Sequence, residues 1–449
     1  MVTLDLQKDL TRLLFMKFSK SLLLFGAGKS ATVLIDYLKN KSAENNWQLV
    51  VADNNLEVVQ AKLEDHPNTK AVKINIESEI DRKQLVANAD IVISMMPPFL
   101  HYLIAIDCIE FGKNLLTASY TDTKIQALSD EINKKGLLFL CEMGLDPGID
   151  HMSAMKLIDE IKSKNGKISS FKSHCGGLVA PEDDDNPWHY KISWNPRNVV
   201  LAGKDGATFK KDGQVFENSY AKIFDTKEQV AIPGLSLLSF YPNRDSISYI
   251  DLYQLDDIKT FIRTTLRYPS FIAGWKKMVD WKFTDEIENI QTAGMTIADF
   301  FTIRFKDLDK IDLSDTAIIE LFEYLGLNDH QTKLPMNNGT FADVLQFVLE
   351  NKLVLKPGEK DMVVMLHEIE YFIGDTFHRI ESSLVTVGKD DQKTAMAKTV
   401  GLPLGIAAVL ILEGKIIDKG LHIPIIPSIY GPVLIELAKE SIQFKESHF

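Results

Sequence analysis

The 449-residue sequence contains little that would place it among disulfide-stabilised, membrane-spanning or nucleic-acid-binding proteins. Only three residues are cysteines, too few for a disulfide framework in a chain of this length, so we expect a reducing compartment. Apolar runs fall short of the roughly 20 residues that span a bilayer. Acidic residues outnumber basic ones by 62 to 50, which argues against nucleic-acid binding. We therefore expect a cytoplasmic protein that binds neither membrane nor nucleic acid.

Metal-binding motifs are also missing from the sequence. The segment His367-Glu368-Ile369-Glu370 has one histidine, but it lacks the second histidine of the zinc-protease motif. The apolar segment 394–412 is interrupted by Lys398 and Pro403, so we expect a buried helix there and not a membrane span. We predict no metal site.

The first third of the chain alternates short apolar runs with segments of helical character. The runs are 21–25, 47–53, 71–74, 90–94, 114–118 and 137–141. The first, SLLLF, has four consecutive apolar residues without alternation, as is typical of a parallel strand covered on both faces. Strands that alternate with helices indicate βαβ units and a parallel sheet. We predict an α/β fold that begins with a doubly wound parallel sheet of the Rossmann type.

Beyond residue 150 the pattern changes to longer alternating strands, then helices, then two more strands. We predict a second, mixed α/β sheet domain and a small all-α insertion within it. Residues 1–20 do not resemble a signal peptide, and we treat them as an N-terminal extension without an assigned function. The expected domains are 21–145 with 393–449 (dinucleotide binding), 146–275 with 356–392 (substrate binding and dimerisation) and 276–355 (helical insertion).

A glycine loop follows the first predicted strand and opens a helix. In Gly26-x-Gly28-x-x-Ala31, the first glycine permits a tight turn and the second lets a pyrophosphate approach the backbone. The helix N-terminus then favours the negative charge, so we expect Gly26, Gly28, Lys29 and Ser30 to contact the cofactor.

The ends of the next strands supply further cofactor candidates. Asp53 ends the second predicted strand, where a carboxylate can hold ribose hydroxyls and repel a 2′-phosphate; this predicts NAD over NADP as the cofactor. Asn75 follows the third strand. Met96 follows the fourth and is placed beside the nicotinamide ribose, with simple core packing as the other interpretation.

Longer segments carry a more specific signature. They include ADIVISMMPPFLHYLIA (89–105), CEMGLDPGIDHMSAMKLIDEIK (141–162), CGGLVAPEDDDNPWHYKISWNP (175–196) and TTLRYPSF (264–271). With these segments the chain resembles saccharopine dehydrogenases of the L-glutamate-forming type, from about residue 20 to 430. The resemblance implies a homodimeric oxidoreductase of lysine metabolism that acts on a CH–NH bond. Saccharopine would be oxidised to an imine, which hydrolyses to L-glutamate and 2-aminoadipate 6-semialdehyde.

The resemblance also implies roles for single residues. The substrate would contact Ser119, Tyr120, Asp146, Arg244, Thr265, Leu266 and Arg267. The cofactor would also contact Leu145 and Asn195, and the catalytic candidates are Asp146, Tyr120 and Cys175. Arginine suits a tricarboxylate such as saccharopine, because its planar fork donates two parallel hydrogen bonds. We expect Arg244 and Arg267 to meet the substrate beside the nicotinamide ring.

The sequence does not single out one proton-transfer group. His101 is a further candidate, although a structural role is the preferred interpretation. Two other functions are also conceivable on the same scaffold: an amine–semialdehyde condensing enzyme such as carboxynorspermidine synthase, and a non-catalytic dinucleotide-binding redox sensor. Both fit less well, because a polyamine substrate needs fewer arginines than Arg244 and Arg267 provide, and a sensor has no need of the polar substrate set.

Overall fold

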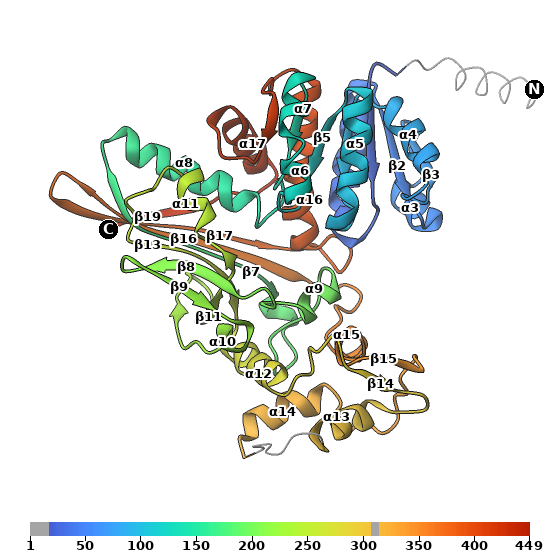
Figure 1. The fold of residues 1–449 in the computed structure, drawn as a ribbon, viewed down its shortest axis with the longest axis vertical. Coiled ribbons are helices and arrows are strands. Elements are labelled where there is room, and N and C mark those ends of the chain that lie inside the picture. Colours follow the sequence, from blue (N-terminus) through green and yellow to red (C-terminus); the bar gives the residue numbers. More distant parts are fainter. Residues whose placement is uncertain (1–17, 307–313) are drawn as a thin grey trace, which may run out of the picture. The chain divides into compact units, whose positions relative to one another are not determined.

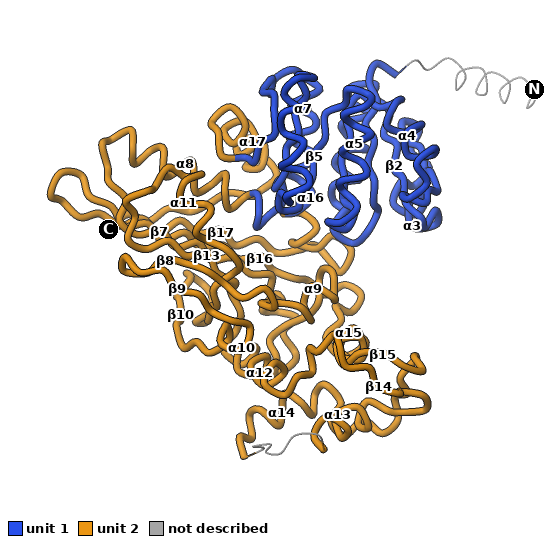
Figure 2. The backbone as a smooth tube through the Cα atoms, viewed as in Figure 1, with its two compact units in different colours: residues 1–148, 400–424 blue, residues 149–399, 425–449 orange. Residues whose placement is uncertain are grey.

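The computed structural model describes residues 18–306 and 314–449, which form two compact units (Figures 1 and 2). Unit 1 contains the described part of residues 1–148 together with 400–424, and unit 2 contains the described part of 149–399 together with 425–449. Most of the predicted N-terminal extension therefore lies outside the described residues.

Unit 1 is built on a seven-stranded sheet in which all neighbouring strands are parallel, with the order β18-β6-β5-β4-β1-β2-β3. Its strands are β1 (Ser21–Phe25), β2 (Gln48–Asp53), β3 (Thr69–Lys73), β4 (Ile91–Ser94), β5 (Asn114–Thr117), β6 (Leu138–Leu140) and β18 (Gly420–His422). The order reverses between β1 and β4, which is where doubly wound sheets bind their ligands. The predicted Rossmann sheet is confirmed, with β18 as an addition that the sequence did not indicate.

Helices connect these strands. They are η1 (Lys29–Ala31), α2 (Thr32–Asn45), α3 (Leu56–Leu63), α4 (Glu79–Ala87), η2 (Pro98–Leu100), α5 (His101–Phe111), α6 (Thr123–Gln126) and α7 (Ser129–Lys134). Four of the five β1 residues are buried, as expected for a strand covered on both faces.

The helix α16 (Ala395–Leu412) is long and apolar enough to cross a membrane, but 78% of it is buried inside the protein. Gly401 allows it to approach α2 closely, because a Cβ there would lie only 2.9 Å from the Cβ of Leu34. These contacts agree with the expected buried helix.

Unit 2 is built on a ten-stranded mixed sheet. Its main order is β10-β11-β13-β7-β16-β17-β19, and β8 joins β9, β12 and β13 off this path. The strands are β7 (Lys167–Val179), β8 (Ala207–Lys211), β9 (Gln214–Asn218), β10 (Gln229–Val230), β11 (Leu238–Pro242), β12 (Arg244–Asp245), β13 (Thr260–Arg267), β16 (Asp361–Ile373), β17 (Thr376–Val387) and β19 (Lys445–His448). Since β7 and β13 are parallel while β7 and β16 are antiparallel, the predicted mixed sheet is confirmed.

The helices of unit 2 include those of the predicted insertion. They are α8 (Ile149–Ser163), η3 (Pro181–Asp183), α9 (Pro196–Val200), α10 (Tyr220–Ile223), α11 (Ser248–Leu252), α12 (Pro269–Asp280), α13 (Ile297–Lys306), α14 (Thr316–Tyr324), α15 (Phe341–Lys352) and α17 (Pro427–Lys439). The insertion also contains a two-stranded sheet of β14 (Asn289–Gln291) and β15 (Asn338–Thr340), so it is mainly but not entirely helical. Its apolar core is continuous with Trp188, Tyr190 and Tyr241, so it packs as part of unit 2.

The last residues of the chain differ from the expected division. Residues 393–399 and 425–449 group with unit 2, whereas we expected all of 393–449 in the dinucleotide-binding domain. The reason is pairing: β19 joins the edge strand β17, and Tyr430 on α17 donates a 2.6 Å hydrogen bond to Asp159 on α8. All four residues of β19 are exposed and polar or charged, so no apolar pattern marks this strand in the sequence.

Candidate functional site

The glycine loop of unit 1 has the geometry that its sequence predicts. Gly26 has a φ of +98°, and a Cβ at this position would lie 2.9 Å from the carbonyl oxygen of Met95, at the end of β4. A side chain at Gly26 would therefore push the two strand ends apart. A Cβ at Gly28 would meet no protein atom within 4 Å, which leaves room for a bound group to approach the backbone.

Two charged side chains hold Ala27, the residue between these glycines. The Ala27 N–H donates to Asp53 Oδ2 at 2.8 Å, and the Ala27 carbonyl accepts from Lys62 Nζ at 2.8 Å. The other carboxylate oxygen of Asp53 accepts from the Asn55 N–H at 2.9 Å. Both Asp53 oxygens thus bind the protein backbone, which the sequence interpretation had not foreseen.

Lys62 is a functional candidate that the sequence analysis missed. Its ammonium also donates to Gly28 O at 2.7 Å and to Thr32 Oγ1 at 2.9 Å. Burial lowers the pKa of Lys62 to about 8, although Asp53 and Asp36 act in the opposite direction. No motif marks a lysine in the last turn of α3, so only the structure could reveal this contact.

The other cofactor candidates of unit 1 differ in their exposure. Lys29 is exposed at the start of η1, and Ser30 beside it is partly buried. Asn75 is exposed beyond the end of β3, where its side chain accepts from the Glu77 N–H at 3.1 Å. Part of the Met96 side chain packs against the apolar core, in agreement with the alternative interpretation of this residue. The assignments of all these residues to the cofactor stay predictions.

A polar group follows the carboxyl ends of β4 and β5. The ring of His101 lies between two hydroxyls, with Nδ1 2.8 Å from Ser94 Oγ and Nε2 2.8 Å from Ser119 Oγ. Burial lowers the pKa of His101 to about 4, so the ring is neutral at neutral pH. His101 therefore orients Ser119, one of the predicted substrate contacts.

Tyr120 and Asp146, two of the predicted catalytic candidates, lie close together in unit 1. The Tyr120 hydroxyl lies 3.4 Å from Asp146 Oδ1, at the long end of the hydrogen-bond range. Leu145, next to Asp146, is buried. A phenol and a carboxylate at this distance can exchange a proton with a shared ligand.

In unit 2, the predicted substrate residues of β13 lie on two different faces of the sheet. Thr265 and Arg267 are two positions apart, so their side chains lie on the same face of the sheet. Cys175 on β7 lies directly opposite Thr265. Leu266 points to the opposite face, where it is fully buried in an apolar cluster with Leu178 and Phe240. The Leu266 side chain thus lies on the other face from Thr265 and Arg267. Only the backbone of Leu266 could meet a ligand on their face.

Arg267 is buried, with 5% of its surface exposed. Its guanidinium lies over the rings of Tyr190 and Phe271, at 5.1 and 5.4 Å, and donates to the backbone carbonyl of Leu266 at 2.7 Å. Within residues 18–306 and 314–449 its Nε has no acceptor, and no carboxylate forms an ion pair with it. A buried guanidinium without a protein counter-ion is suited to an anionic ligand.

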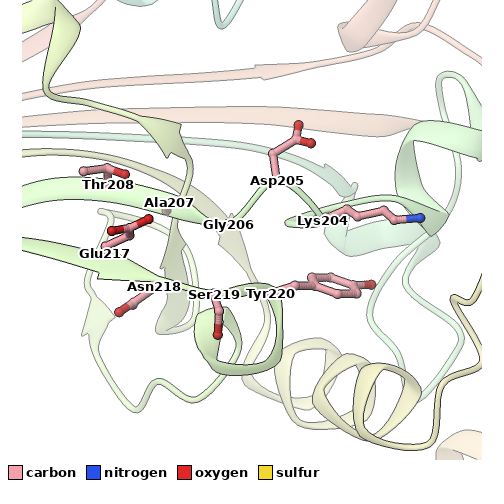
Figure 3. Close-up of a pocket in the computed structure, with 9 residues that line it drawn as sticks. All are labelled: Lys204, Asp205, Gly206, Ala207, Thr208, Glu217, Asn218, Ser219 and Tyr220. Carbon is pink, nitrogen blue, oxygen red and sulfur yellow. The ribbon is translucent and has the colours of Figure 1, made fainter.

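Arg244 lies in a different setting. It is exposed, has a φ of +51°, and its guanidinium is 3.9 Å from the carboxylate of Asp205. In the pairing of β12 with β8, Arg244 lies opposite Ala207. Ala207, Asp205 and Tyr220 are among the residues that line a hollow of about 410 Å³ (Figure 3). None of the predicted site residues lines this hollow.

Asn195 has a structural role at the start of α9. Asn195 caps α9, and its side chain accepts from the Arg197 N–H at 2.9 Å, so its predicted cofactor contact would come in addition to this capping role. Among the described residues, no group of three histidine, cysteine or acidic side chains is arranged to hold a metal ion.

Comparisons with known proteins place both parts of the chain in one family. Residues 22–140 match the family described as saccharopine dehydrogenase NADP binding domain, and residues 144–442 match the saccharopine dehydrogenase C-terminal domain. The apo, histidine-tagged saccharopine dehydrogenase (L-Glu forming) from Saccharomyces cerevisiae has a similar solved structure. Its TM-score is 0.84 at 33% identity, and the match covers 96% of this chain and all of that chain.

Two curated fungal relatives are similar over nearly their full length. The saccharopine dehydrogenase (NADP(+), L-glutamate-forming) of Schizosaccharomyces pombe is 33% identical, with 95% of this chain and 98% of the relative covered. The protein of the same name from S. cerevisiae is 35% identical over 95% of this chain and 99% of the relative. The mouse mitochondrial alpha-aminoadipic semialdehyde synthase is 33% identical, and this chain spans 49% of its length.

These names contradict the predicted preference for NAD. The matching N-terminal family is NADP-binding, and the fungal relatives are named for NADP(+). The structure supplies the physical reason for the error. The Asp53 carboxylate was expected to repel a 2′-phosphate, but its oxygens accept from Ala27 and Asn55, and the positive charge of Lys62 acts on it.

The fold, the family matches and the full-length relatives agree with one another. The chain is an oxidoreductase that belongs to the saccharopine dehydrogenase family.

Proposed function

We propose that this chain is an NADP-dependent saccharopine dehydrogenase of the L-glutamate-forming type, which acts in lysine metabolism. In this reaction the C–H bond beside the secondary amine of saccharopine loses a hydride, and the product is an imine. Water adds to the imine, and the C–N bond then breaks to give L-glutamate and 2-aminoadipate 6-semialdehyde. The names of the fungal relatives support both the reaction and the cofactor.

The observation that carries the proposal is the buried guanidinium of Arg267. Saccharopine has three carboxylates, and Arg267 is a buried cation with no carboxylate partner among the described residues. A carboxylate bound there would gain charge-assisted hydrogen bonds at a site already shielded from water. Thr265 and Cys175 share its side of the sheet and would line the same surface.

The residues of unit 1 suit a dinucleotide. The open backbone at Gly28 and the helix that starts at Lys29 would hold its phosphates. When bound, the nicotinamide ring of NADP accepts the hydride. Ser119, Tyr120 and Asp146 follow β5 and β6, where the carboxyl ends of the strands of a doubly wound sheet meet the ligand.

The chain's own groups would handle the protons. The substrate amine must lose a proton before its hydride can leave, and the water that adds to the imine must lose one as well. The Tyr120 hydroxyl and the Asp146 carboxylate, 3.4 Å apart, are the groups best placed within unit 1 to move these protons. His101 is kept neutral by burial and holds Ser119, so we assign it to orientation.

We also propose that the protein acts in the cytoplasm as a homodimer. The small number of cysteines supports a reducing compartment. Size-exclusion chromatography with light scattering would test the dimer, and fractionation of cells would test the location.

A coupled pair of rate measurements tests the proposed function. Purified protein should reduce NADP with saccharopine and release one glutamate per NADPH formed, and it should act less efficiently with NAD. A polyamine adduct in place of saccharopine should give no reduction. Failure to oxidise saccharopine with either cofactor would overturn the proposal, and a higher kcat/KM with NAD would overturn its cofactor.

A further inference from the structure

Lys62 lies beneath the glycine loop and uses all three of its ammonium protons there. Its acceptors are the carbonyl oxygens of Ala27 and Gly28, at 2.8 and 2.7 Å, and Thr32 Oγ1, at 2.9 Å. The first two belong to the loop itself, and the third belongs to the helix that the loop opens. One side chain from α3 therefore ties together the parts of unit 1 that would hold the cofactor phosphates.

We propose that Lys62 is a positioning residue that orients the glycine loop for the cofactor phosphates and supplies positive charge beneath them. This inference rests on the proposed function and extends it to a residue outside the glycine motif. No other charged side chain bonds both loop carbonyls in the described part of the chain.

Peptide geometry explains how a lysine that bonds carbonyls can prepare an anion site. In a trans peptide the C=O and the next N–H point in opposite directions. When Lys62 holds the carbonyls of Ala27 and Gly28, it turns the N–H groups of Gly28 and Lys29 to the other side of the loop. At Gly28 that backbone has no protein atom near the position of a Cβ, so a phosphate can approach it.

Asp53 fixes the same loop from the other direction. It accepts the Ala27 N–H at 2.8 Å, so the two peptide groups that flank Ala27 are held by opposite charges. This bracing leaves the loop little freedom to rotate its amides. A loop held in its binding conformation loses less entropy when the ligand binds, so its affinity is higher.

The charge of Lys62 makes the role measurable. The charged groups that face Lys62 are Asp53 at the end of β2 and Asp36 on α2. The ammonium of Lys39, also on α2, donates a hydrogen bond to the backbone carbonyl of Lys62 at 2.9 Å. Burial lowers the pKa of Lys62 to about 8, so the unliganded protein loses this proton in mildly alkaline solution. A bound phosphate favours the protonated form, so cofactor affinity should fall as the pH rises above about 8.

The test measures the Kd of NADPH by its fluorescence, together with steady-state kinetics at several pH values. At pH 7, Lys62→Met should raise the Kd and the KM of the cofactor roughly tenfold or more, as loss of about one charge-assisted contact would. The KM of saccharopine should stay within about twofold. Lys62→Arg should keep most of the affinity and lose the decline above pH 8, because guanidinium stays protonated.

A matched control is Lys41→Met, since Lys41 also lies in unit 1 but pairs with the exposed Glu44. It should leave both constants unchanged. Equal NADPH affinity of wild type and Lys62→Met would overturn the inference. If Lys62→Met fails to fold, the comparison of the wild type with Lys62→Arg still tests the inference. A decline in NADPH affinity above pH 8 that persists in Lys62→Arg would overturn the inference. Wild-type protein that binds neither NADPH nor NADH would instead refute the proposed function.

Discussion

His101 Nε2 lies 2.8 Å from Ser119 Oγ, and the other nitrogen of the same ring lies 2.8 Å from Ser94 Oγ. The ring thereby links the end of β4 to the segment after β5. Because the pKa of His101 is lowered to about 4, one nitrogen donates and the other accepts at neutral pH. Ser119 is held in one orientation by a neutral partner.

This relationship predicts that His101→Gln and Ser119→Ala act through the same contact. Each should raise the KM of saccharopine roughly three- to tenfold, as expected for one lost hydrogen bond of about 1 kcal/mol. The double variant should be no worse than the more severe single variant, because coupled residues are not additive. Steady-state kinetics at pH 7 measures all three. The control His66→Gln, in the same unit, should behave like the wild type, and full additivity of the two changes would contradict the prediction.

Two buried histidines predict a loss of stability in mild acid. Burial lowers the pKa of His101 and of His367 from 6.5 to about 4. Between these values the unfolded chain binds more protons than the folded chain, so stability falls as the pH drops from about 6.5 to 4. Each histidine contributes on the order of 3 kcal/mol over this interval.

Urea unfolding at pH 7 and pH 5 measures this effect. His367→Gln should reduce the difference between the two pH values, because glutamine does not titrate and can still meet Ser153, which lies 2.7 Å from His367 Nε2. An unchanged pH dependence in this variant would show that other groups cause the acid sensitivity.

A buried ion pair in unit 2 predicts a large effect on stability. Arg263 Nη2 lies 2.8 Å from Asp150 Oδ2, and both side chains are 2% exposed. Asp150→Asn should lower the free energy of unfolding by about 3–5 kcal/mol, because it leaves a buried charge uncompensated. The matched control on the same helix is Glu160→Gln, whose partner Lys156 is exposed; it should cost less than about 1 kcal/mol. Thermal and urea unfolding compare the two, and equal losses would contradict the prediction.

The sequence could predict those parts of the fold whose signal is local. A short apolar run such as Leu22–Phe25 favours a strand covered on both faces, and the glycines between it and a helix add to the indication of a dinucleotide-binding unit. The short strand β18 and the exposed strand β19 were missed, because their places depend on distant partners and not on their own apolar pattern.

The candidate site was predicted mainly through the family resemblance, which assigned Ser119, Tyr120 and Asp146 to it. Ser119, Tyr120 and Asp146 follow strand ends, so the sheet brings them near one another in unit 1. Lys62 had no motif, and its role follows from hydrogen bonds to residues 30 to 35 positions away. The cofactor error has the same origin: a strand-end aspartate predicts its ligand only while its oxygens are free, and the bonds of Asp53 are tertiary contacts.

The last prediction concerns the two arginines, which the structure places in unlike surroundings. Arg267 is buried against Tyr190 and Phe271, whereas Arg244 is exposed near Asp205. Arg267→Lys should lower kcat/KM for saccharopine by roughly 30- to 100-fold, since lysine cannot reproduce the stacked, forked contact, worth about 2–3 kcal/mol. Arg244→Ala should raise the KM of saccharopine and leave the binding of NADPH intact.

The matched control for Arg267→Lys is Arg304→Lys. Arg304 is also buried and stacked, 3.3 Å from the ring centre of Phe341, but it already has a carboxylate partner, Glu288. Both lysine variants lose a stacked guanidinium, so a loss of packing alone should affect them alike. A fall in kcat/KM confined to Arg267→Lys, with NADPH affinity unchanged, would mark Arg267 as a substrate anchor, and similar kinetic losses in both would refute that role.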